Sequence, residues 1–424
     1  MSGFKIFPSA SNENSTGNAD IKKEFLAGLV MFLSNSYTLI LIPSLVSSAG
    51  VPFRVVFAAM VILTVVTSIF ASFASGVPLF VSTSVPLAGY VAYFLIKKSF
   101  VPVESAFGAV FYSGVIFLIL VLSGQMKRLS QLIPEPLKKS IPAALGFLLA
   151  FLAFNGTSSP HKLYAVLAGI AFGVVAMVAS KDFYLPLTLL FTLVVSLLLG
   201  IKSPVEVGGT ASSIATWDWH RFFYFWEGFK EPGQALSVVF LSLFFASFLD
   251  VTGTTWTVYS SLGKEPDERA SSVYSSIALG TIAGSFFGHP PLAVHAECLS
   301  GIHAGGKTPL STLFASLLFL LSFPLLPVIE KVPAVSTAPL LFLVGALLFK
   351  EVGRIELSNP EEFVPSFATI AIVPLTMNLA AGIASGFVVY TLMSLAKKKV
   401  PNVFVLIIAF FSALYLLFGG VFSF

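Results

Sequence analysis

The sequence predicts an all-α, polytopic membrane protein. Three observations support this class: 56% of the 424 residues are hydrophobic, only 10% are charged, and the mean hydropathy is +0.93. A soluble domain carries about 25% charged residues, so the composition excludes an ordinary soluble fold. The apolar runs are long and continuous, whereas a membrane β-barrel would show short alternating strands. At roughly 20 residues for each crossing, the chain has room for about a dozen or more spans.

Charge and cysteine content exclude further classes. The formal charge of +4 is small, and the basic residues lie in the expected loops, so positive-inside bias explains them better than nucleic-acid binding does. The single cysteine, Cys298, excludes an intramolecular disulfide and a cysteine metal cluster. Residues 1–20 lack an apolar core of signal-peptide length, and we expect a disordered cytoplasmic tail there.

The first half should contain seven apolar segments. Segment 25–48 carries polar residues at mid-span, Ser34 to Tyr37, which either join helices by hydrogen bonds or line a site. Segment 76–97 is interrupted: VPLFVSTS reads as extended chain, and Pro86 can start a helix. A broken helix at membrane depth is tolerated only where it faces protein or a water-filled cavity. The other five are expected at about 53–75, 102–123, 140–154, 161–179 and 183–200. The loop after the fourth is predicted to be cytoplasmic from its basic residues, Lys127, Arg128, Lys138 and Lys139.

The second half follows a long connection, residues 201–232. Its aromatic stretch 217–229 should lie on the membrane surface as an anchor. Residues 363–395 are broken by two prolines and Asn378, and could form one long tilted helix or two short ones. That choice decides on which side the C-terminus lies, so the expected count is 14 spans, give or take one. The remaining spans are expected at about 233–260, 268–287, 290–304, 308–328, 336–350 and 401–421.

Internal symmetry is weak but detectable. The third segment of each half is short, helical only in its second part and preceded by proline. IPEPLKKSIPAALGFLL (133–149) also echoes VPAVSTAPLLFLVGALL (332–348) at matching places. Because seven is odd, the second half must enter the membrane with the opposite orientation. Paired interrupted segments in inverted repeats indicate a transporter site at the repeat interface.

Two acidic residues lie inside apolar spans. Asp250 has Thr254 and Thr257 at helical spacing, and Glu297 lies about two turns into its helix if that helix starts near Pro290. An ionisable group at membrane depth costs several kcal/mol by most estimates. We therefore expect both carboxylates at one cavity near the bilayer midplane; capping or bridging of helices is the alternative. Two such groups suit a neutral, hydrogen-bonding solute coupled to protons.

The remaining candidate chemistry is sparse. His289, His295 and His303 do not have the spacing of a metal pair, so no metal and no other cofactor is expected. His295 either lies near the cavity or serves in packing. The sequence shows no nucleophile–base pattern and no phosphate loop, which argues against an enzyme.

The chain resembles the purine nucleobase permeases of the azaguanine-resistance type, within the nucleobase–cation and nucleobase–ascorbate symporter superfamily. Four stretches carry the resemblance: KKEFLAGLVMFLSNSYTLILIPSLVSSAG, FLDVTGTTWTV, AECLSGIHAGGKTPLSTLFASLLFLLSFPL and VPSFATIAIVPLTMNLAAGIASGFVVY. The second resembles an Asp-Thr-x-Gly-Thr element and the third a Glu-Ser-x-x-Gly-x-x-x-Gly-Gly-[RK]-Thr element. The chain departs from the family pattern at 293–298, AVHAEC, where the family usually reads Thr-Thr-Tyr-x-Glu-Ser.

This resemblance implies 14 spans in two inverted repeats of seven, with short strands before half-helices 3 and 10. It implies a core domain (21–125 and 233–330) that moves against a gate domain (126–232 and 331–424) in an elevator-like step. It also implies that Asp250 and Glu297 bind substrate, that protons drive symport, and that the chain can form a homodimer.

We therefore predict a multi-pass permease of the plasma or inner membrane that takes up a nucleobase with protons. A purine is favoured: adenine, guanine or hypoxanthine. The alternatives are uracil or xanthine as substrate, sodium as coupling ion, and an anion transporter of the sulfate-permease type with the same fold. Predicted substrate contacts are Asp250, Glu297, Ser84, Ala293 and Thr254, with ligand acceptors received by backbone N–H groups near Ser84 and Ala293. Predicted proton-coupling residues are Asp250, Glu297 and His295.

Overall fold

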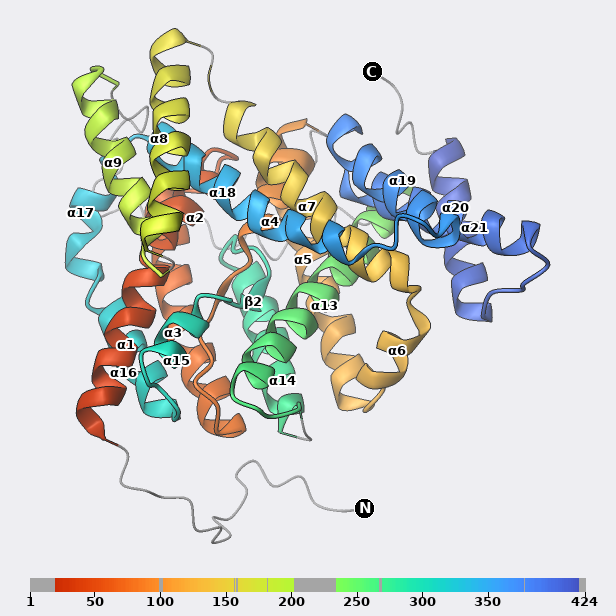
Figure 1. The fold of residues 1–424 in the computed structure, drawn as a ribbon, viewed down its shortest axis with the longest axis horizontal. Coiled ribbons are helices and arrows are strands. Elements are labelled where there is room, and N and C mark those ends of the chain that lie inside the picture. The colour runs from red at the N-terminus through yellow and green to blue at the C-terminus, as the bar shows by residue number, and fades with distance from the viewer. Residues whose placement is uncertain are drawn as a thin grey trace, which may run out of the picture.

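The computed structural model describes residues 20–98, 102–155, 157, 159–180, 182–201, 234–266, 269–376 and 378–418 (Figure 1). The predicted N-terminal tail, apart from Asp20, and the predicted interfacial stretch 217–229 lie outside these residues. Eight helices in the described part of the chain are long and apolar enough to cross a membrane. Several shorter apolar helices accompany them, so the prediction of an all-helical membrane protein is confirmed.

The first half of the chain contains α1 (Ile21–Asn35), α2 (Thr38–Ser47), α3 (Phe53–Ser75), β1 (Val81–Thr83), α4 (Val85–Gly89), the π-helix η1 (Tyr90–Lys98), α5 (Val103–Leu122), α6 (Met126–Leu132), α7 (Glu135–Asn155), α8 (Pro160–Ala179) and α9 (Tyr184–Leu198). The second half contains α13 (Gln234–Ser261), α14 (Ala270–Ser285), β2 (Leu292–Val294), α15 (Cys298–His303), α16 (Pro309–Leu320), α17 (Leu326–Ile329), α18 (Ala338–Phe349), α19 (Pro360–Thr376), α20 (Leu379–Ala396) and α21 (Val403–Phe418). Three 3₁₀ turns, η2 (Phe323–Leu325), η3 (Ala334–Thr337) and η4 (Lys350–Arg354), connect elements of the second half.

The first span is broken where its polar residues cluster. α1 ends at Asn35 and α2 begins at Thr38, so Ser36 and Tyr37 form a turn inside the span. At the opposite end of α1, the buried carboxylate of Glu24 accepts backbone N–H groups of Lys307 (3.1 Å), Thr308 (3.1 Å) and Ser311 (3.2 Å). These bonds satisfy donors that the start of α16 would otherwise leave unpaired, and they tie α1 to α16.

The two interrupted spans meet through a two-stranded antiparallel sheet. β1 pairs with β2 in the register Val81↔Val294 and Thr83↔Leu292. The predicted strands before half-helices 3 and 10 are therefore present. The predicted helix start near Pro290 is wrong, because residues 292–294 pair with β1 and the helix begins only at Cys298. Glu297 thus lies at the start of α15, not two turns into it.

α7 and α18 cross the middle of the molecule side by side (Figure 1). They contain most of the two segments that echo each other in sequence, 133–149 and 332–348. They approach most closely at Gly146 and Gly345, where a Cβ added to either glycine would collide with the backbone carbonyl of the other. Only glycine permits this distance, so the sequence echo marks a backbone contact between the two repeats.

Residues 363–395 form two antiparallel helices, which decides between the two alternatives. Gly382 of α20 packs on Val373 of α19, and the ends of the pair are joined by an ion pair between Lys397 and Glu361 (2.5 Å). Glu362, next along α19, pairs with Lys139 at the start of α7. The basic residues after α20 therefore lie on the same face as Lys139 at the start of α7, the face predicted to be cytoplasmic.

α21 runs back along α20 toward the opposite face. Asn402, just before α21, donates to the carbonyl of Leu132 (3.2 Å), and Tyr415 near the end of α21 accepts from Asn378 at the start of α20 (2.8 Å).

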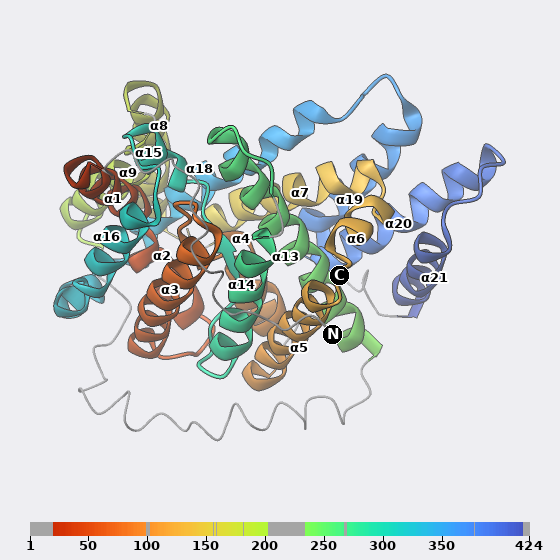
Figure 2. The same cartoon turned by 90° about the horizontal axis from the view of Figure 1, so that it is seen from below.

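The packing partners of the other helices fall into two sets (Figure 2). In one set α1, α3, α5, α13, α14 and α16 contact each other, and in the other α7, α8, α9, α18, α19 and α20 do.

Candidate functional site

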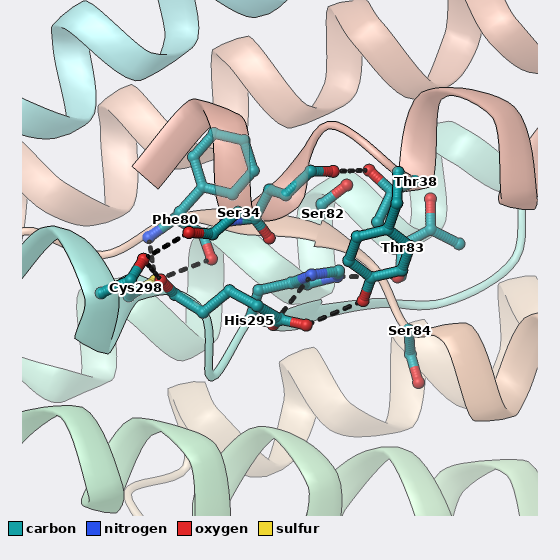
Figure 3. A network of polar contacts seen from close by, with 12 residues as sticks. Ser34, Thr38, Phe80, Ser82, Thr83, Ser84, His295 and Cys298 are labelled. Atoms are coloured by element: carbon teal, nitrogen blue, oxygen red, sulfur yellow. Dashed lines mark hydrogen bonds and ion pairs between the residues drawn. The ribbon is translucent and has the colours of Figure 1, made fainter. Parts of the chain in front are cut away.

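The polar residues of the two interrupted spans converge around the two-stranded sheet (Figure 3). Thr83 at the end of β1 links both histidines of this region. Its hydroxyl lies 2.7 Å from His289 Nε2, and its carbonyl lies 2.9 Å from His295 Nε2. His289 Nδ1 lies 2.7 Å from the carbonyl of Pro290. Because a carbonyl only accepts, His289 donates from Nδ1 and accepts the Thr83 hydroxyl at Nε2, so both of its nitrogens serve the fold.

Ser84 connects the first interrupted span to Asp250. As the N-cap of α4, its hydroxyl oxygen accepts the N–H of Leu87 (3.4 Å), and the hydroxyl donates to Asp250 Oδ2 (2.8 Å). The structure therefore brings together two residues predicted for the site that lie 166 positions apart. The backbone N–H of Ser84 donates to Pro291 O (2.9 Å), so that group is not free for a ligand.

Asp250 lies on α13, where Thr254 follows one turn later. The Thr254 hydroxyl donates to the backbone carbonyl of Asp250 (2.6 Å). Only the lone pairs of the Thr254 oxygen are then available to another partner. The charges of His295 and Glu297 both act on the Asp250 carboxylate. Asp250 and Glu297 therefore share one polar region, and a substrate cavity between them stays a prediction.

Glu297 lies at the entrance to α15 and receives a hydrogen bond from the first span. The buried Tyr37 hydroxyl donates to Glu297 Oε1 (2.8 Å), and Glu297 Oε2 lies 3.6 Å from His295 Nδ1. The Glu297 side chain is 21% exposed, whereas that of His295 is 6% exposed. Glu297 is thus the more accessible member of this pair.

Ala293 does not occupy the position expected of it. It pairs with Ser82 in the sheet and is 2% exposed, so its backbone serves the ladder. In the part of the chain that the structure describes, the N–H groups of Ala296 and Glu297 donate to no acceptor in the chain. These two amides, just after the strand, replace those of Ser84 and Ala293 as candidates for a ligand acceptor.

Two tyrosines near Glu297 have no distinct signal in the sequence. Tyr37 was visible only as part of a polar cluster, and its partner Glu297 lies 260 positions away. Tyr184 starts α9 in the other set of helices, and the charge of Glu297 acts on its phenol. No spacing in the sequence links either tyrosine to Glu297. Cys298 is buried and its sulfur accepts the N–H of Phe80 (2.9 Å), which secures α15 to β1.

Metal chemistry has no visible support at this site. Within the residues that the structure describes, no cluster of three or more His, Cys, Asp or Glu side chains could hold a metal ion. What the arrangement offers is two carboxyl groups, hydroxyls, one imidazole and two backbone amides. Such groups can bind and release a polar solute without covalent chemistry.

Comparison with known proteins identifies the family of the chain. The family model described as "Permease family" (Xan_ur_permease) matches residues 22–389. The guanine/hypoxanthine permease PbuO of Bacillus subtilis is 28% identical, over 94% of this chain and 98% of its own length. The adenine permease AdeP of Escherichia coli is 25% identical, over 90% and 89%.

Solved structures with the same fold transport other solutes. The transmembrane domain of the cyanobacterial bicarbonate transporter BicA aligns with a TM-score of 0.61 at 12% identity, over 87% of this chain and 98% of that domain. The murine solute carrier 26 family member A9 anion transporter, in its inward-facing state, aligns with a TM-score of 0.63 at 12% identity, over 90% and 69%. These alignments confirm the predicted fold of two inverted repeats of seven spans. Since the family model covers most of the sequence, the chain belongs to this permease family and is a multi-pass membrane transporter, not an enzyme.

Proposed function

We propose that the chain is a secondary active transporter that takes up a nucleobase together with protons, with a purine such as guanine, hypoxanthine or adenine as substrate. One observation carries the proposal: Asp250 and Glu297 share a polar region in which Ser84 and Tyr37 hold one oxygen of each carboxylate. The second oxygens and the remaining lone pairs can accept the N–H donors of a heterocycle. The amides of Ala296 and Glu297 would donate to its ring nitrogen or carbonyl.

The relatives support a nucleobase as the substrate class. Guanine, hypoxanthine and adenine appear in the names of permeases that align with nearly the whole chain. These relatives are 25–28% identical to this chain and are named for different bases. The His295 side chain, where the family usually has Tyr, stands next to Glu297 and would contribute to that choice.

An elevator-like step fits the way the helices pack. Ser84, Asp250 and Glu297 all belong to the predicted core domain, 21–125 and 233–330. The helices of this domain contact one another more than they contact helices of the predicted gate domain. Tyr184 belongs to 126–232, part of the predicted gate domain, and lies near Glu297. In this proposal the core carries the substrate past the gate, and the Tyr184 side chain is left behind.

The fold alone would equally suit an anion, since the bicarbonate and solute carrier 26 structures share it. Two carboxylates at the site argue against this alternative, because each would repel an anionic ligand by several kcal/mol in a poorly solvated region. Purified protein in liposomes separates the two. We expect uptake of radiolabelled hypoxanthine, guanine or adenine under an inward proton gradient, its collapse with a protonophore, and no uptake of sulfate or bicarbonate. Uptake that follows a sodium gradient would overturn proton coupling, and uptake of the anions alone would overturn the proposal.

A further inference from the structure

The protonation pattern of His295 is fixed by the backbone of β1. Its Nε2 lies 2.9 Å from the Thr83 carbonyl, which only accepts hydrogen bonds, so Nε2 carries a hydrogen. Neutral imidazole has one N–H, and Nδ1 is then a lone-pair acceptor. That lone pair faces Glu297 Oε2 at 3.6 Å. Two acceptors facing each other are stable only with a proton between them or a donor bridging them.

The other oxygen of Glu297 is already occupied. Tyr37 Oη donates to Oε1 at 2.8 Å, and Tyr37 is buried, which restricts rotation of the carboxyl group. Oε2 is thereby held on the His295 side. Glu297 therefore connects a fixed donor on one side with a proton acceptor on the other.

We propose that His295 Nδ1 and Glu297 Oε2 share one exchangeable proton, that this pair holds the proton coupled to transport, and that Tyr37 is the residue that positions the carboxyl group for it. The inference rests on the proposed function, because it specifies where the coupling proton resides.

The proton transfer is balanced within the pair. Starting from the neutral acid and neutral imidazole, the Glu297 O–H bond breaks and an N–H bond forms at His295 Nδ1, giving a carboxylate and an imidazolium with no change in net charge. A distance of 3.6 Å is longer than a hydrogen bond, so the transfer needs a carboxyl movement of about 0.5 Å or one bridging water. Exchange with solvent occurs at Glu297, the more exposed member of the pair.

Several other titratable groups face the pair. Asp250 on α13 interacts electrostatically with His295. The charge of Glu297 acts on two phenols, those of Tyr184 on α9 and of Tyr37 between α1 and α2. Cys298 on α15 is buried beside Glu297, and His289 reaches the pair only through Thr83. Two carboxyl groups, those of Asp250 and Glu297, therefore accompany the His295 imidazole in this region.

His289 provides a matched comparison for His295. Both rings are buried and both bond to Thr83, yet each His289 nitrogen already has a partner within the fold. A proton acceptor is available only on His295. The variants His295→Gln and His289→Gln therefore remove one imidazole each, with different expected consequences.

Calorimetry of hypoxanthine binding to the purified full chain tests the proposal. Titrations in two buffers of different ionisation enthalpy, from about pH 5.5 to 8, give the number of protons exchanged for each hypoxanthine bound. In the wild type we expect this number to change across the range. In His295→Gln the change should be lost or displaced by about one pH unit or more, while His289→Gln should keep the wild-type profile. An unchanged profile in His295→Gln would overturn the inference.

Tyr37→Phe tests the positioning role. Without the Oη donor the Glu297 carboxyl group is no longer held toward His295, so hypoxanthine binding should weaken about five- to tenfold and the pH profile should be displaced; an unchanged profile would refute the positioning role. Infrared spectroscopy of the wild type needs no variant: a carboxylic-acid stretching band should appear or vanish when hypoxanthine binds, and an unaltered carboxyl region would contradict the shared proton. If no nucleobase binds the wild type, the proposed function fails. If hypoxanthine binds but the wild type and His295→Gln show the same pH profile of proton exchange, only this inference fails.

Discussion

The two interrupted spans share one design and differ in how they use it. In the first, β1 leads into α4, whose cap Ser84 makes a side-chain capping bond, and residues 85–89 are all buried. The helical path then continues through η1 to Lys98. In the second, β2 leads into α15, which has six residues, and its N-cap residue Glu297 makes no side-chain capping bond.

This difference separates scaffold from site. At the first span the N-cap side chain satisfies the start of its own helix, and only one hydroxyl proton is directed outward, toward Asp250. At the second, the N-cap position holds a carboxyl group that makes no capping bond, accepts from Tyr37 and faces His295. Among the described residues, the N–H groups of Ala296 and Glu297, just before the helix, have no acceptor in the chain. Unsatisfied amides and a partly exposed carboxyl are costly in a membrane unless a ligand uses them. The second span should therefore dominate transport, and the first should modulate it.

Glu297→Gln tests the dominant span and should have the largest effect. The amide cannot hold a proton or bind N–H donors as a charged acceptor, so initial hypoxanthine uptake in liposomes should fall about 100-fold, as expected for about 3 kcal/mol of lost interaction. Gln has nearly the same shape, and the unfolding midpoint should stay within a few degrees of the wild type. Near-normal uptake would mean that the two spans do not differ as argued.

Asp250→Asn tests the link between the spans and should cost less. Asn can still accept the Ser84 hydroxyl but loses the charge that attracts His295. We expect a fall in uptake of about 10- to 30-fold, near 1.5–2 kcal/mol. Thr252→Val is the matched control on α13, because its hydroxyl bonds the Phe248 carbonyl of its own helix. Equal losses in both variants would indicate disturbance of α13 and not of the site.

Ser84→Ala tests the scaffold span and should have a smaller effect. It removes the donor to Asp250 and the cap of α4, each worth about 1 kcal/mol. Uptake should fall about five- to tenfold, and the unfolding midpoint should drop by a few degrees. Ser84→Thr keeps the hydroxyl and should recover most of both quantities. A loss as large as that of Glu297→Gln would place the main contacts at the first span instead.

Much of this comparison could be predicted from sequence. Prolines and short apolar segments marked both interrupted spans, and isolated acids in apolar surroundings marked Asp250 and Glu297. The start of α15 could not be predicted, because residues 292–294 become a strand only by pairing with β1, more than 200 positions earlier. That long-range register moved Glu297 to the helix start and buried the Ala293 backbone.

The contact between Tyr37 and Glu297 also could not be predicted from local sequence. The polar neighbours of Tyr37 were recognised, but hydrogen bonding between helices and lining of a site predict the same residue types. Only the position of Glu297, supplied by the fold, separates the two possibilities. Local chemistry was therefore predictable, whereas the pairing of distant groups was not.

Glu330→Gln changes an ion pair outside both interrupted spans and tests whether the stability of the scaffold affects the pH dependence of transport. Arg54 at the start of α3 donates to both oxygens of Glu330 after α17 (2.8 and 2.9 Å), and these bonds hold the pKa of Glu330 below its usual value. A lowered pKa means that the stabilisation is complete above the unfolded-state pKa of about 4.3 and is lost as pH falls through the folded-state pKa.

At pH 7 this variant should be less stable than the wild type by about 2 kcal/mol, and the difference should narrow below about pH 4. Scanning fluorimetry of both proteins in detergent from about pH 3.5 to 7 measures this. Since the ion pair does not titrate between about pH 5 and 8, the pH profile of hypoxanthine uptake should be that of the wild type. A displaced uptake profile in Glu330→Gln would show that pH acts on transport through the stability of the scaffold, and the assignment of that dependence to the span of Glu297 would then be wrong.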